Sequence, residues 1–186
     1  CEIEMRVIAG KARRLPLKTI QGLDTRPTTD RIKETLFNII QDEIPGSRFL
    51  DLFAGSGNMG FEAISRGIDS VVFCDCGYKA IQTISANAAA LQVKEQCRII
   101  KSDYEVLLKQ LIKARERFDF IYIDPPYRKQ RIHEILTLID AHDLLKENGN
   151  VVCESLKEDS FAESYGNLYQ VKSVNYGITK ITYYKR

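Results

Sequence analysis

The sequence predicts an α/β protein built on a mostly parallel β-sheet. Apolar, β-branched segments alternate with helical segments, a glycine-rich turn follows the first strand, and an acidic residue follows four of the strands. Strands connected through helices form right-handed crossovers and therefore run parallel. The length of 186 residues suits one domain. A content of 44% hydrophobic and 28% charged residues excludes the disordered, collagen-like and coiled-coil classes.

The first helix is expected over residues 28–41, where Pro27 precedes Thr28 as a candidate N-cap and apolar side chains recur at helical spacing. Pro45 and Gly46 then break the pattern. Six further segments complete this half of the chain: we expect strands at 48–53, 71–75 and 97–101, and helices at 58–66, 78–91 and 103–115.

The second half continues the alternation. We expect a strand at 118–123, a helix at 131–140 and, after a turn at 148–150, a strand at 151–154. Two β-rich runs follow at 168–174 and 178–184, on either side of Tyr176 and Gly177. So short a connection predicts a C-terminal antiparallel strand pair.

The chain divides into a basic N-terminal extension with its helix, residues 1–45, and a main domain, residues 46–186. Met5 is a candidate initiator, which would make Cys1–Glu4 foreign to the natural protein. No apolar run approaches the roughly 18 residues that cross a bilayer, and the start lacks the basic and apolar regions of a signal peptide. We therefore expect a cytoplasmic protein without a membrane partner.

Cysteine and histidine spacing argues against a metal. The five cysteines stand at 1, 74, 76, 97 and 153 without a C-x-x-C pair, which fits neither a disulfide scaffold nor a zinc site. His133 and His142 lie nine residues apart, a poor spacing for one helical face. We expect reduced, structural cysteines and no metal.

Charge is unevenly distributed. The net charge is +2, yet eight basic residues oppose two acidic ones between Met5 and Lys33. A basic arm on a mildly acidic body suggests a footprint for a polyanion, most often nucleic acid. A solvated basic surface is the plain alternative.

Acidic residues mark the carboxyl ends of the expected strands, where parallel sheets hold their ligands. They are Asp51 before the glycine turn, Asp75, Asp103 and Asp124. Gly55 to Gly60 matches G-x-G-x-x-G and Asp75 follows Gly55 by 20 residues, a spacing that also fits a nicotinamide dinucleotide.

Asp51 argues against a nicotinamide dinucleotide, because a carboxylate beside the turn repels a pyrophosphate and attracts a cation. S-adenosylmethionine carries an ammonium and a sulfonium group and no phosphate. Asp75 can accept hydrogen bonds from its ribose hydroxyls and Asp103 from its adenine amino group, with Tyr104 or Phe53 packing nearby. Asp103 as a helix cap remains an alternative.

Asp124-Pro125-Pro126-Tyr127 is the candidate catalytic sequence. Two prolines stiffen the strand exit and remove two backbone donors. The Asp124 carboxylate and the Pro125 carbonyl can then accept both hydrogens of an exocyclic amino group, which aims the nitrogen lone pair at a donor methyl. Tyr127 can stack on the presented base. Orientation would supply most of the catalysis, without a separate base.

These motifs resemble one family. Phe53-x-Gly55-x-Gly57 with Asp124-Pro-Pro-Tyr127 is similar to the amino-group methyltransferases that use S-adenosylmethionine. The chain resembles more closely the 16S ribosomal RNA guanine-N2 methyltransferases of the RsmD type. That resemblance runs through Met5 to Lys11, Arg14-Leu-Pro, Arg26 to Asn38, Leu50 to Gly57 and Glu62 to Arg66.

The resemblance implies a Rossmann-like class I methyltransferase fold that ends in an antiparallel strand pair, and a guanine of bacterial 16S rRNA in the small ribosomal subunit as substrate. It implies that residues 46–186 form the S-adenosylmethionine-dependent methyltransferase domain. The family often has Glu where Asp75 stands. The expected donor-binding residues are Asp51, Phe53, Ala54, Gly55, Ser56, Gly57, Asp75, Asp103, Tyr104, Thr28 and Thr29. The expected RNA-binding residues are Arg6, Lys11, Arg13, Arg14, Arg26, Arg31, Arg128, Lys129 and Arg131.

Other functions stay open at this point. The same loop can present the N6 amino group of adenine in DNA or RNA, and a non-catalytic RNA-binding assembly factor could retain the fold. A nicotinamide-dependent oxidoreductase is a more distant alternative. We expect a monomer, as suits a small enzyme acting on a large particle.

Overall fold

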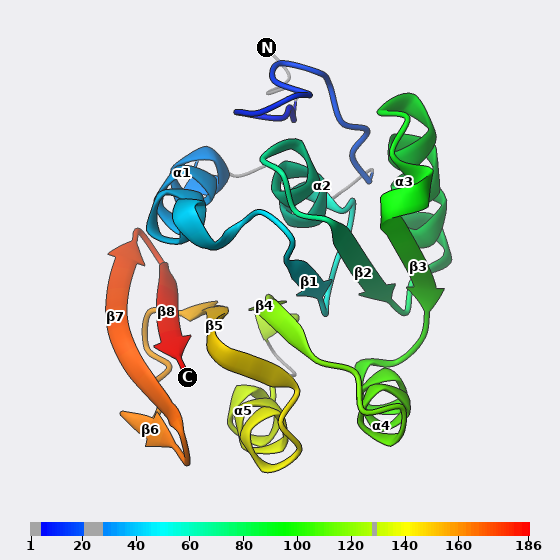
Figure 1. Cartoon of the computed structure of the whole chain (residues 1–186). Coiled ribbons are helices and arrows are strands. Elements are labelled where there is room, and N and C mark those ends of the chain that lie inside the picture. Colours follow the sequence, from blue (N-terminus) through cyan, green and yellow to red (C-terminus); the bar gives the residue numbers. More distant parts are fainter. Residues whose placement is uncertain (1–4, 21–27, 128–129) are drawn as a thin grey trace. The chain divides into compact units, whose positions relative to one another are not determined.

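The computed structural model describes residues 5–20, 28–127 and 130–186, in two compact units, Cys1–Tyr104 and Glu105–Arg186 (Figure 1). For Thr28 and Thr29 it describes the backbone alone.

Unit 1 is built on three parallel strands, β1 (Arg48–Asp51), β2 (Ser70–Asp75) and β3 (Cys97–Lys101). β2 lies in the middle and pairs in parallel with both neighbours. β1 and β2 are apolar and almost fully buried, as expected of strands covered on both faces. Their parallel direction brings the carboxyl ends of all three strands to one edge.

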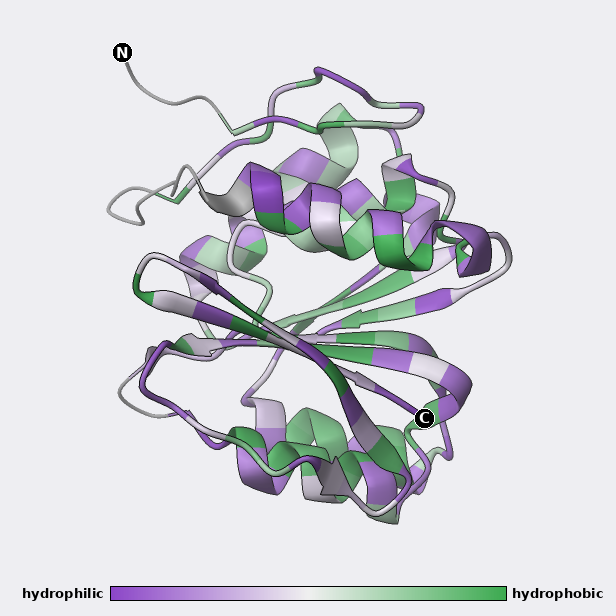
Figure 2. Cartoon of the chain, turned by 90° about the vertical axis from the view of Figure 1, so that its left-hand side faces the viewer, coloured by the Kyte–Doolittle hydropathy of each residue, from purple (hydrophilic) through white to green (hydrophobic). Residues whose placement is uncertain are grey.

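Helices cover these strands. They are α1 (Thr28–Ile40), α2 (Asn58–Ser65) and α3 (Tyr78–Ala90), with short 3-10 turns η1 (Gln41–Glu43) and η2 (Lys94–Gln96). All eight residues of α2 are buried. A side chain on Gly60 would place its Cβ 2.3 Å from the Phe73 ring, so this glycine allows α2 to lie against β2. The helices turn their hydrophobic sides toward the strands (Figure 2).

Residues 5–20, here called the arm, form a hairpin-like segment. Arg6 and Pro16 make an antiparallel bridge, and Val7 donates to the Leu15 carbonyl while Arg14 donates to the Val7 carbonyl. Val7 and Leu17 are buried. The arm is therefore an ordered part of unit 1.

Unit 2 begins within α4 (Tyr104–Lys113), whose first residue belongs to unit 1 and whose remaining residues belong to unit 2. Its elements are β4 (Phe118–Ile123), α5 (Ile132–Ala141), β5 (Leu145–Leu156), β6 (Ser164–Tyr165), β7 (Leu168–Tyr176) and β8 (Thr179–Lys185). β5 pairs in parallel with β4 and antiparallel with β8. β7 pairs antiparallel with β8 and with the short β6.

The alternation of strands and helices and the C-terminal antiparallel pair predicted from the sequence are confirmed. The expected strand start at Val151 is wrong, because β5 begins at Leu145. Leu145 pairs with Phe118 and Asn150 with Phe120, so the expected turn at 148–150 falls inside an irregularity of the strand. Asn148 there adopts φ +65°. β6 was not expected, and α4 begins one residue after Asp103.

Three negative findings apply to the described residues only. None of their helices is long and apolar enough to cross a membrane. No group of three His, Cys, Asp or Glu side chains among them is arranged to hold a metal ion. Their four cysteines, Cys74, Cys76, Cys97 and Cys153, are free thiols.

Candidate active site

The glycine turn joins β1 to α2 and has a positive φ at two of its glycines. Gly55 has φ +58° and Gly57 has φ +84°, both in the left-handed region that glycine adopts without a Cβ penalty. An added Cβ would meet nothing within 4 Å at Gly55, whereas at Gly57 it would lie 2.5 Å from the Phe61 ring. Gly55 thus leaves open space beside the backbone, and Gly57 allows the turn to lie against α2.

Asp51, the last residue of β1, is a buried acid. Its exposed fraction is 1%, and the Gly60 amide donates to its Oδ2 at 3.3 Å. Burial raises its pKa from 3.8 to about 7; the Gly60 hydrogen bond opposes this shift and nearby Asp75 adds to it. A carboxyl group in this position gains most from a cationic ligand group, because a positive charge would offset the desolvation of its anion.

Asp75 ends β2 and connects two loops. Its Oδ2 accepts from the Gly55 amide at 2.9 Å and its Oδ1 accepts from the Gly77 amide at 2.8 Å. Each carboxylate oxygen has a second lone pair, so the half-buried side chain can still accept from ribose hydroxyls. The glycine turn and the acid expected to bind ribose are therefore held together.

Two aromatic rings stand at the ends of β1 and β3. The Phe53 and Tyr104 rings lie 5.1 Å apart, centre to centre, at an angle of 47°. Both are half-buried, and Asp103 beside them is exposed. Ala54, Ser56 and the residues above share this edge, so unit 1 brings together nine of the expected donor-binding residues: Asp51, Phe53, Ala54, Gly55, Ser56, Gly57, Asp75, Asp103 and Tyr104.

The Asp-Pro-Pro-Tyr sequence follows β4 in unit 2. Asp124 is half-buried, Pro125 is buried and Pro126 is exposed. The Tyr127 hydroxyl lies 3.4 Å from Thr179 Oγ1 at the start of β8, which fixes one end of its ring. The acid thus stands at a strand end, followed by a stiff turn and an oriented tyrosine.

The expected RNA-binding residues fall into three groups. Arg6, Arg13 and Arg14 of the arm line one pocket in unit 1, and Lys11 and Arg31 are exposed elsewhere in that unit. Arg131 is exposed directly before α5 in unit 2. Arg26, Arg128 and Lys129 lie outside the described residues.

A buried ion network, which the sequence did not reveal, anchors the arm. Lys33 and Glu62 are fully buried, with Lys33 Nζ 3.5 Å from Glu62 Oε2, and Lys33 Nζ donates to the Arg6 carbonyl at 2.9 Å. Glu62 accepts from the amides of Ile8 and Ala9 and from Arg66 Nε. Lys33, counted above as part of the basic footprint, is therefore internal, and burial lowers its pKa.

Asn87 on α3 links the arm to the glycine turn. Its Oδ1 accepts from the Lys18 amide at 2.7 Å, and its Nδ2 donates to the carbonyls of Lys18 and Ser56, each at 3.1 Å. Ser65 holds the other end of the arm by accepting from the Ala12 amide and donating to the Ala9 carbonyl. Only a three-dimensional structure brings these partners together.

Comparison with known proteins identifies relatives over almost the whole chain. The family model described as "Conserved hypothetical protein 95" matches residues 5–185. YlbH of Bacillus subtilis (strain 168), provisionally named as an rRNA methyltransferase, is 41% identical over 98% of this chain and 99% of its own. Ribosomal RNA small subunit methyltransferase D of Haemophilus influenzae is 36% identical over 83% of this chain and 80% of its own.

Solved structures share the fold. The provisionally named methyltransferase yhhF of Escherichia coli has a TM-score of 0.87 at 29% identity and covers 98% of both chains. The Thermus thermophilus 16S rRNA N2 G1207 methyltransferase RsmC, solved with S-adenosylmethionine and guanosine, has a TM-score of 0.72 at 18% identity and covers 92% of this chain and 46% of its own. The second similarity concerns the fold alone.

The fold and the strand-end site define a Rossmann-like class I methyltransferase, as predicted from the sequence. Within that class, the family model and the relatives above identify the family of this chain. The chain belongs to the Conserved hypothetical protein 95 family, the RsmD-type methyltransferases.

Proposed function

We propose that this chain methylates the exocyclic N2 of a guanine in bacterial 16S rRNA, within the small ribosomal subunit, with S-adenosylmethionine as methyl donor. Membership of the family supports rRNA methylation with this donor. The small subunit as substrate comes from the name of the Haemophilus influenzae relative. The choice of N2 of guanine goes further: the residues after β4 support an exocyclic amino group as the acceptor, and the resemblance to RsmD-type enzymes favours guanine over adenine.

The described residues of unit 1 fit S-adenosylmethionine. Bound there, the cofactor supplies an electrophilic methyl group. The open side of Gly55 admits a ligand against the backbone, and the buried Asp51 suits the cofactor's ammonium group. Asp75 is oriented by two backbone amides and can accept from both ribose hydroxyls. Phe53 and Tyr104 offer apolar ring surface for the adenine, and Asp103 can accept a hydrogen bond from the adenine amino group.

Thr28 and Thr29 complete the proposed donor site. The structure describes only their backbone, at the first turn of α1. We propose that they lie near the methionine end of the donor.

The single observation that carries the acceptor assignment is an acid at the end of β4, followed by two prolines and a tyrosine. Asp124 and the Pro125 carbonyl accept the two amino hydrogens, which turns the nitrogen lone pair away from the base ring. Tyr127 stacks on the base. The methylated nitrogen is acidic and releases its proton to water, so no further base is needed. A base-paired guanine cannot present its amino group in this way and has to leave its stack.

The test is methyl transfer from labelled S-adenosylmethionine to small subunits that lack the modification, with naked rRNA and duplex DNA in parallel. We expect label in the subunit, recovered as N2-methylguanosine. Asp124→Ala should abolish transfer and retain cofactor binding, while Asp69→Ala, a change at an exposed aspartate before the amino end of β2, should retain both.

Other products would assign other functions. Label in DNA as N6-methyladenine would keep the residue roles and replace the substrate. Cofactor binding without transfer to any substrate, or a cellular function retained by Asp124→Ala, would contradict catalysis and favour an RNA-binding assembly factor. A monomeric state and a cytoplasmic location remain predictions.

A further inference from the structure

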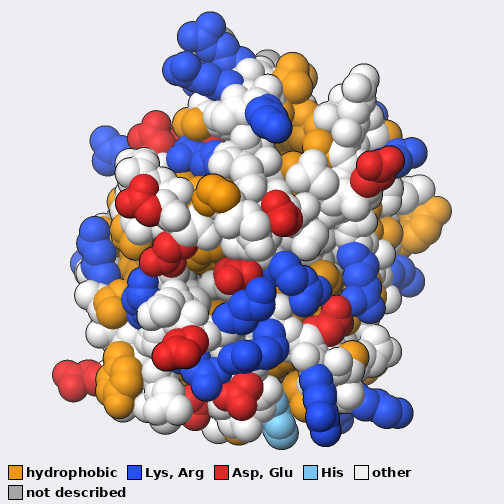
Figure 3. Space-filling view, in the orientation of Figure 1, with side chains coloured by type: hydrophobic (Ala, Val, Ile, Leu, Met, Phe, Trp, Pro, Cys, Tyr) orange, Lys and Arg blue, Asp and Glu red, His pale blue; other side chains and the backbone are white. Residues whose placement is uncertain are grey.

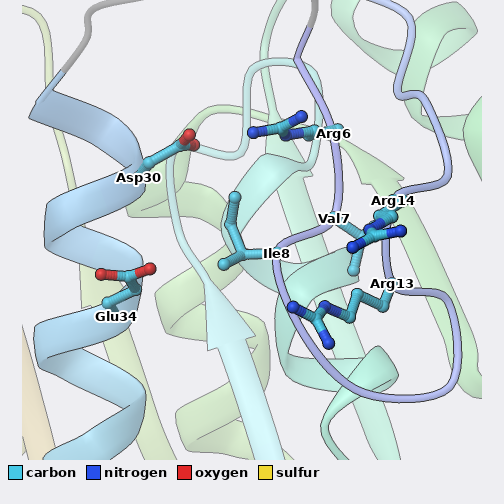
Figure 4. Close-up of a pocket in the computed structure, with 7 residues that line it drawn as sticks. All are labelled: Arg6, Val7, Ile8, Arg13, Arg14, Asp30 and Glu34. Atoms are coloured by element: carbon cyan, nitrogen blue, oxygen red, sulfur yellow. The ribbon is translucent and has the colours of Figure 1, made fainter.

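A pocket of about 420 Å³ lies between the arm and α1 in unit 1, on the surface of the molecule. Its walls are Arg6, Arg13 and Arg14 on the arm and Asp30 and Glu34 on α1, with Val7 and Ile8 between them (Figure 4). The volume falls within the roughly 300–1,000 Å³ of small-molecule sites. Nothing in the methyl-transfer chemistry above uses the two carboxylates of this pocket.

The charged side chains that line the pocket do not form ion pairs with one another. Asp30 and Arg6 point toward each other across it (Figure 4). Nevertheless, within the described part of the chain, no ion pair or hydrogen bond involves the side chains of the five charged lining residues. All five are exposed. Three guanidinium groups and two carboxylates are therefore exposed to a ligand, and Asp30 also interacts electrostatically with the buried Lys33.

The backbone that carries the arginines is fixed before any ligand binds. Lys33 Nζ holds the Arg6 carbonyl and Glu62 holds the amide of Ile8. Arg14 has φ +70°, an uncommon value for a residue with a side chain, and its amide donates to the Val7 carbonyl at 2.8 Å. Such strain persists only where surrounding contacts enforce it, and it is found most often at functional sites.

The mixed charge selects the ligand. A simple anion would be attracted by the arginines and repelled by the two acids. A simple cation would be attracted by the acids and repelled by the arginines. A nucleotide satisfies both walls, because its phosphate accepts from guanidinium groups and its base donates to carboxylates. Among the bases, guanine alone presents N1–H and N2–H side by side, which matches the two oxygens of one carboxylate.

We propose that this pocket binds one guanine nucleotide of the substrate RNA, distinct from the nucleotide that is methylated, with its phosphate on Arg6, Arg13 and Arg14 and its base edge on Asp30 and Glu34. The proposal rests on RNA as the substrate and adds a second nucleotide contact. The pocket would then position the RNA by reading a base outside the reacting centre.

The first experiment observes the pocket directly, in an Asp124→Ala background that removes the proposed acceptor of the methylated guanine. Guanosine monophosphate is titrated while the methyl NMR signals of Val7 and Ile8 are followed. We expect both signals to shift, with inosine monophosphate, which lacks the N2 amino group, binding about 10-fold more weakly. Unmoved signals, or equal shifts with inorganic phosphate alone, would overturn the proposal.

Substitutions then separate the two walls. The double variant Asp30→Asn/Glu34→Gln should lose the preference for guanosine over inosine monophosphate and retain phosphate-dependent binding. Arg13→Gln/Arg14→Gln should weaken both nucleotides alike. The matched exposed controls Glu95→Gln and Lys94→Gln should change neither. A guanosine preference that survives in the Asp30/Glu34 variant would contradict the base assignment.

The last measurement identifies the source of the nucleotide. With small subunits as substrate, both pocket variants should raise KM several-fold and leave kcat unchanged, because none of the substituted residues is among the proposed donor-binding or catalytic residues. If guanosine monophosphate shifts the Val7 and Ile8 signals but the pocket variants leave KM for the small subunit unchanged, the nucleotide bound in the pocket does not come from the substrate RNA. Absence of transfer by the unmodified protein would count against the proposed function, while the NMR titration would still decide the pocket.

Discussion

The Asp51 side chain is kept out of water at the end of β1 and receives one hydrogen bond from Gly60. Burial of an ionised carboxylate is costly unless a positive group compensates it. A cationic ligand group beside Asp51 would therefore stabilise its ionised form. The same burial predicts how stability without cofactor changes with pH.

Asp51→Asn should remove a pH-dependent loss of stability. Because the pKa of Asp51 is about 7 in the folded chain and 3.8 as its reference value, the folded state binds more protons between these values, and the free energy of unfolding falls as pH rises from about 4 to 7. Relative to the parent protein, the Asn variant should gain thermal stability at pH 8 more than at pH 4. Thermal melts at both pH values, with Asp69→Asn as control, measure this difference.

Parallel pH profiles of the parent protein and Asp51→Asn would contradict the raised pKa. The same variant should bind S-adenosylmethionine at least 10-fold more weakly, because a neutral amide replaces the carboxylate that we propose to face the ammonium group. Titration calorimetry at pH 8 measures that loss.

Sequence reasoning located the strand-end acids because each follows an apolar run and precedes a turn. It failed for Lys33, which local charge counting placed on the surface. Its partner Glu62 is 29 positions later on another helix, and no local pattern pairs the two. Asn87 escaped notice for the same reason, since its contacts with Lys18 and Ser56 depend on tertiary packing.

At the level of elements, strand and helix order was predictable, whereas β5 and β6 were misjudged. Asn148 and Gly149 resemble a turn, yet pairing continues past them because an irregular register accommodates the extra residues. β6 has two residues and exists only through its pairing with β7. The third glycine of G-x-G-x-x-G also has a structural explanation, since Gly60 permits α2 to contact Phe73.

The arm depends on the ion network beneath it. Glu62→Gln should destabilise the protein by about 3–5 kcal/mol, because it leaves the buried Lys33 without its anionic partner. The double change Lys33→Met/Glu62→Leu removes the uncompensated charge but should recover only part of that loss, because the Ile8 and Ala9 amides and the Arg6 carbonyl still lose their partners. Thermal melts measure the effect, and limited trypsin digestion at Lys11, Arg13 and Arg14 shows whether the arm is released.

Glu95→Gln, on the exposed η2 turn, serves as the control for the loss of one carboxylate. If Glu62→Gln melted like the control and its arm resisted trypsin as the parent does, the network would not anchor the arm.

At the level of the whole molecule, the modest net charge of +2 conceals a basic arm. Lys and Arg side chains gather where Figure 1 shows the arm, at the top of Figure 3. Lys11, Arg13 and Arg14 are exposed, and Lys33 is excluded from this surface by burial. An RNA partner would meet the exposed arginines first.

Binding of small subunits or their RNA should therefore weaken steeply with salt. Each phosphate contact removed by Arg6→Gln, Arg13→Gln or Arg14→Gln should reduce the slope of log affinity against log salt by roughly 0.7–0.9. Filter binding between 50 and 200 mM salt, which is about the range where such contacts dominate, measures the slopes. Lys94→Gln is the control, and a flat salt response of the parent protein would leave the arm without a role in RNA binding.

Asp75 has a consequence for hydrogen exchange. The amides of Gly55 and Gly77 donate to its two oxygens and lie outside regular secondary structure. One side chain therefore protects two amides, 22 positions apart, from solvent deuterium. Their exchange rates should rise and fall together, which makes this pair of glycines an internal gauge of how firmly the turn after β1 and the start of α3 are held.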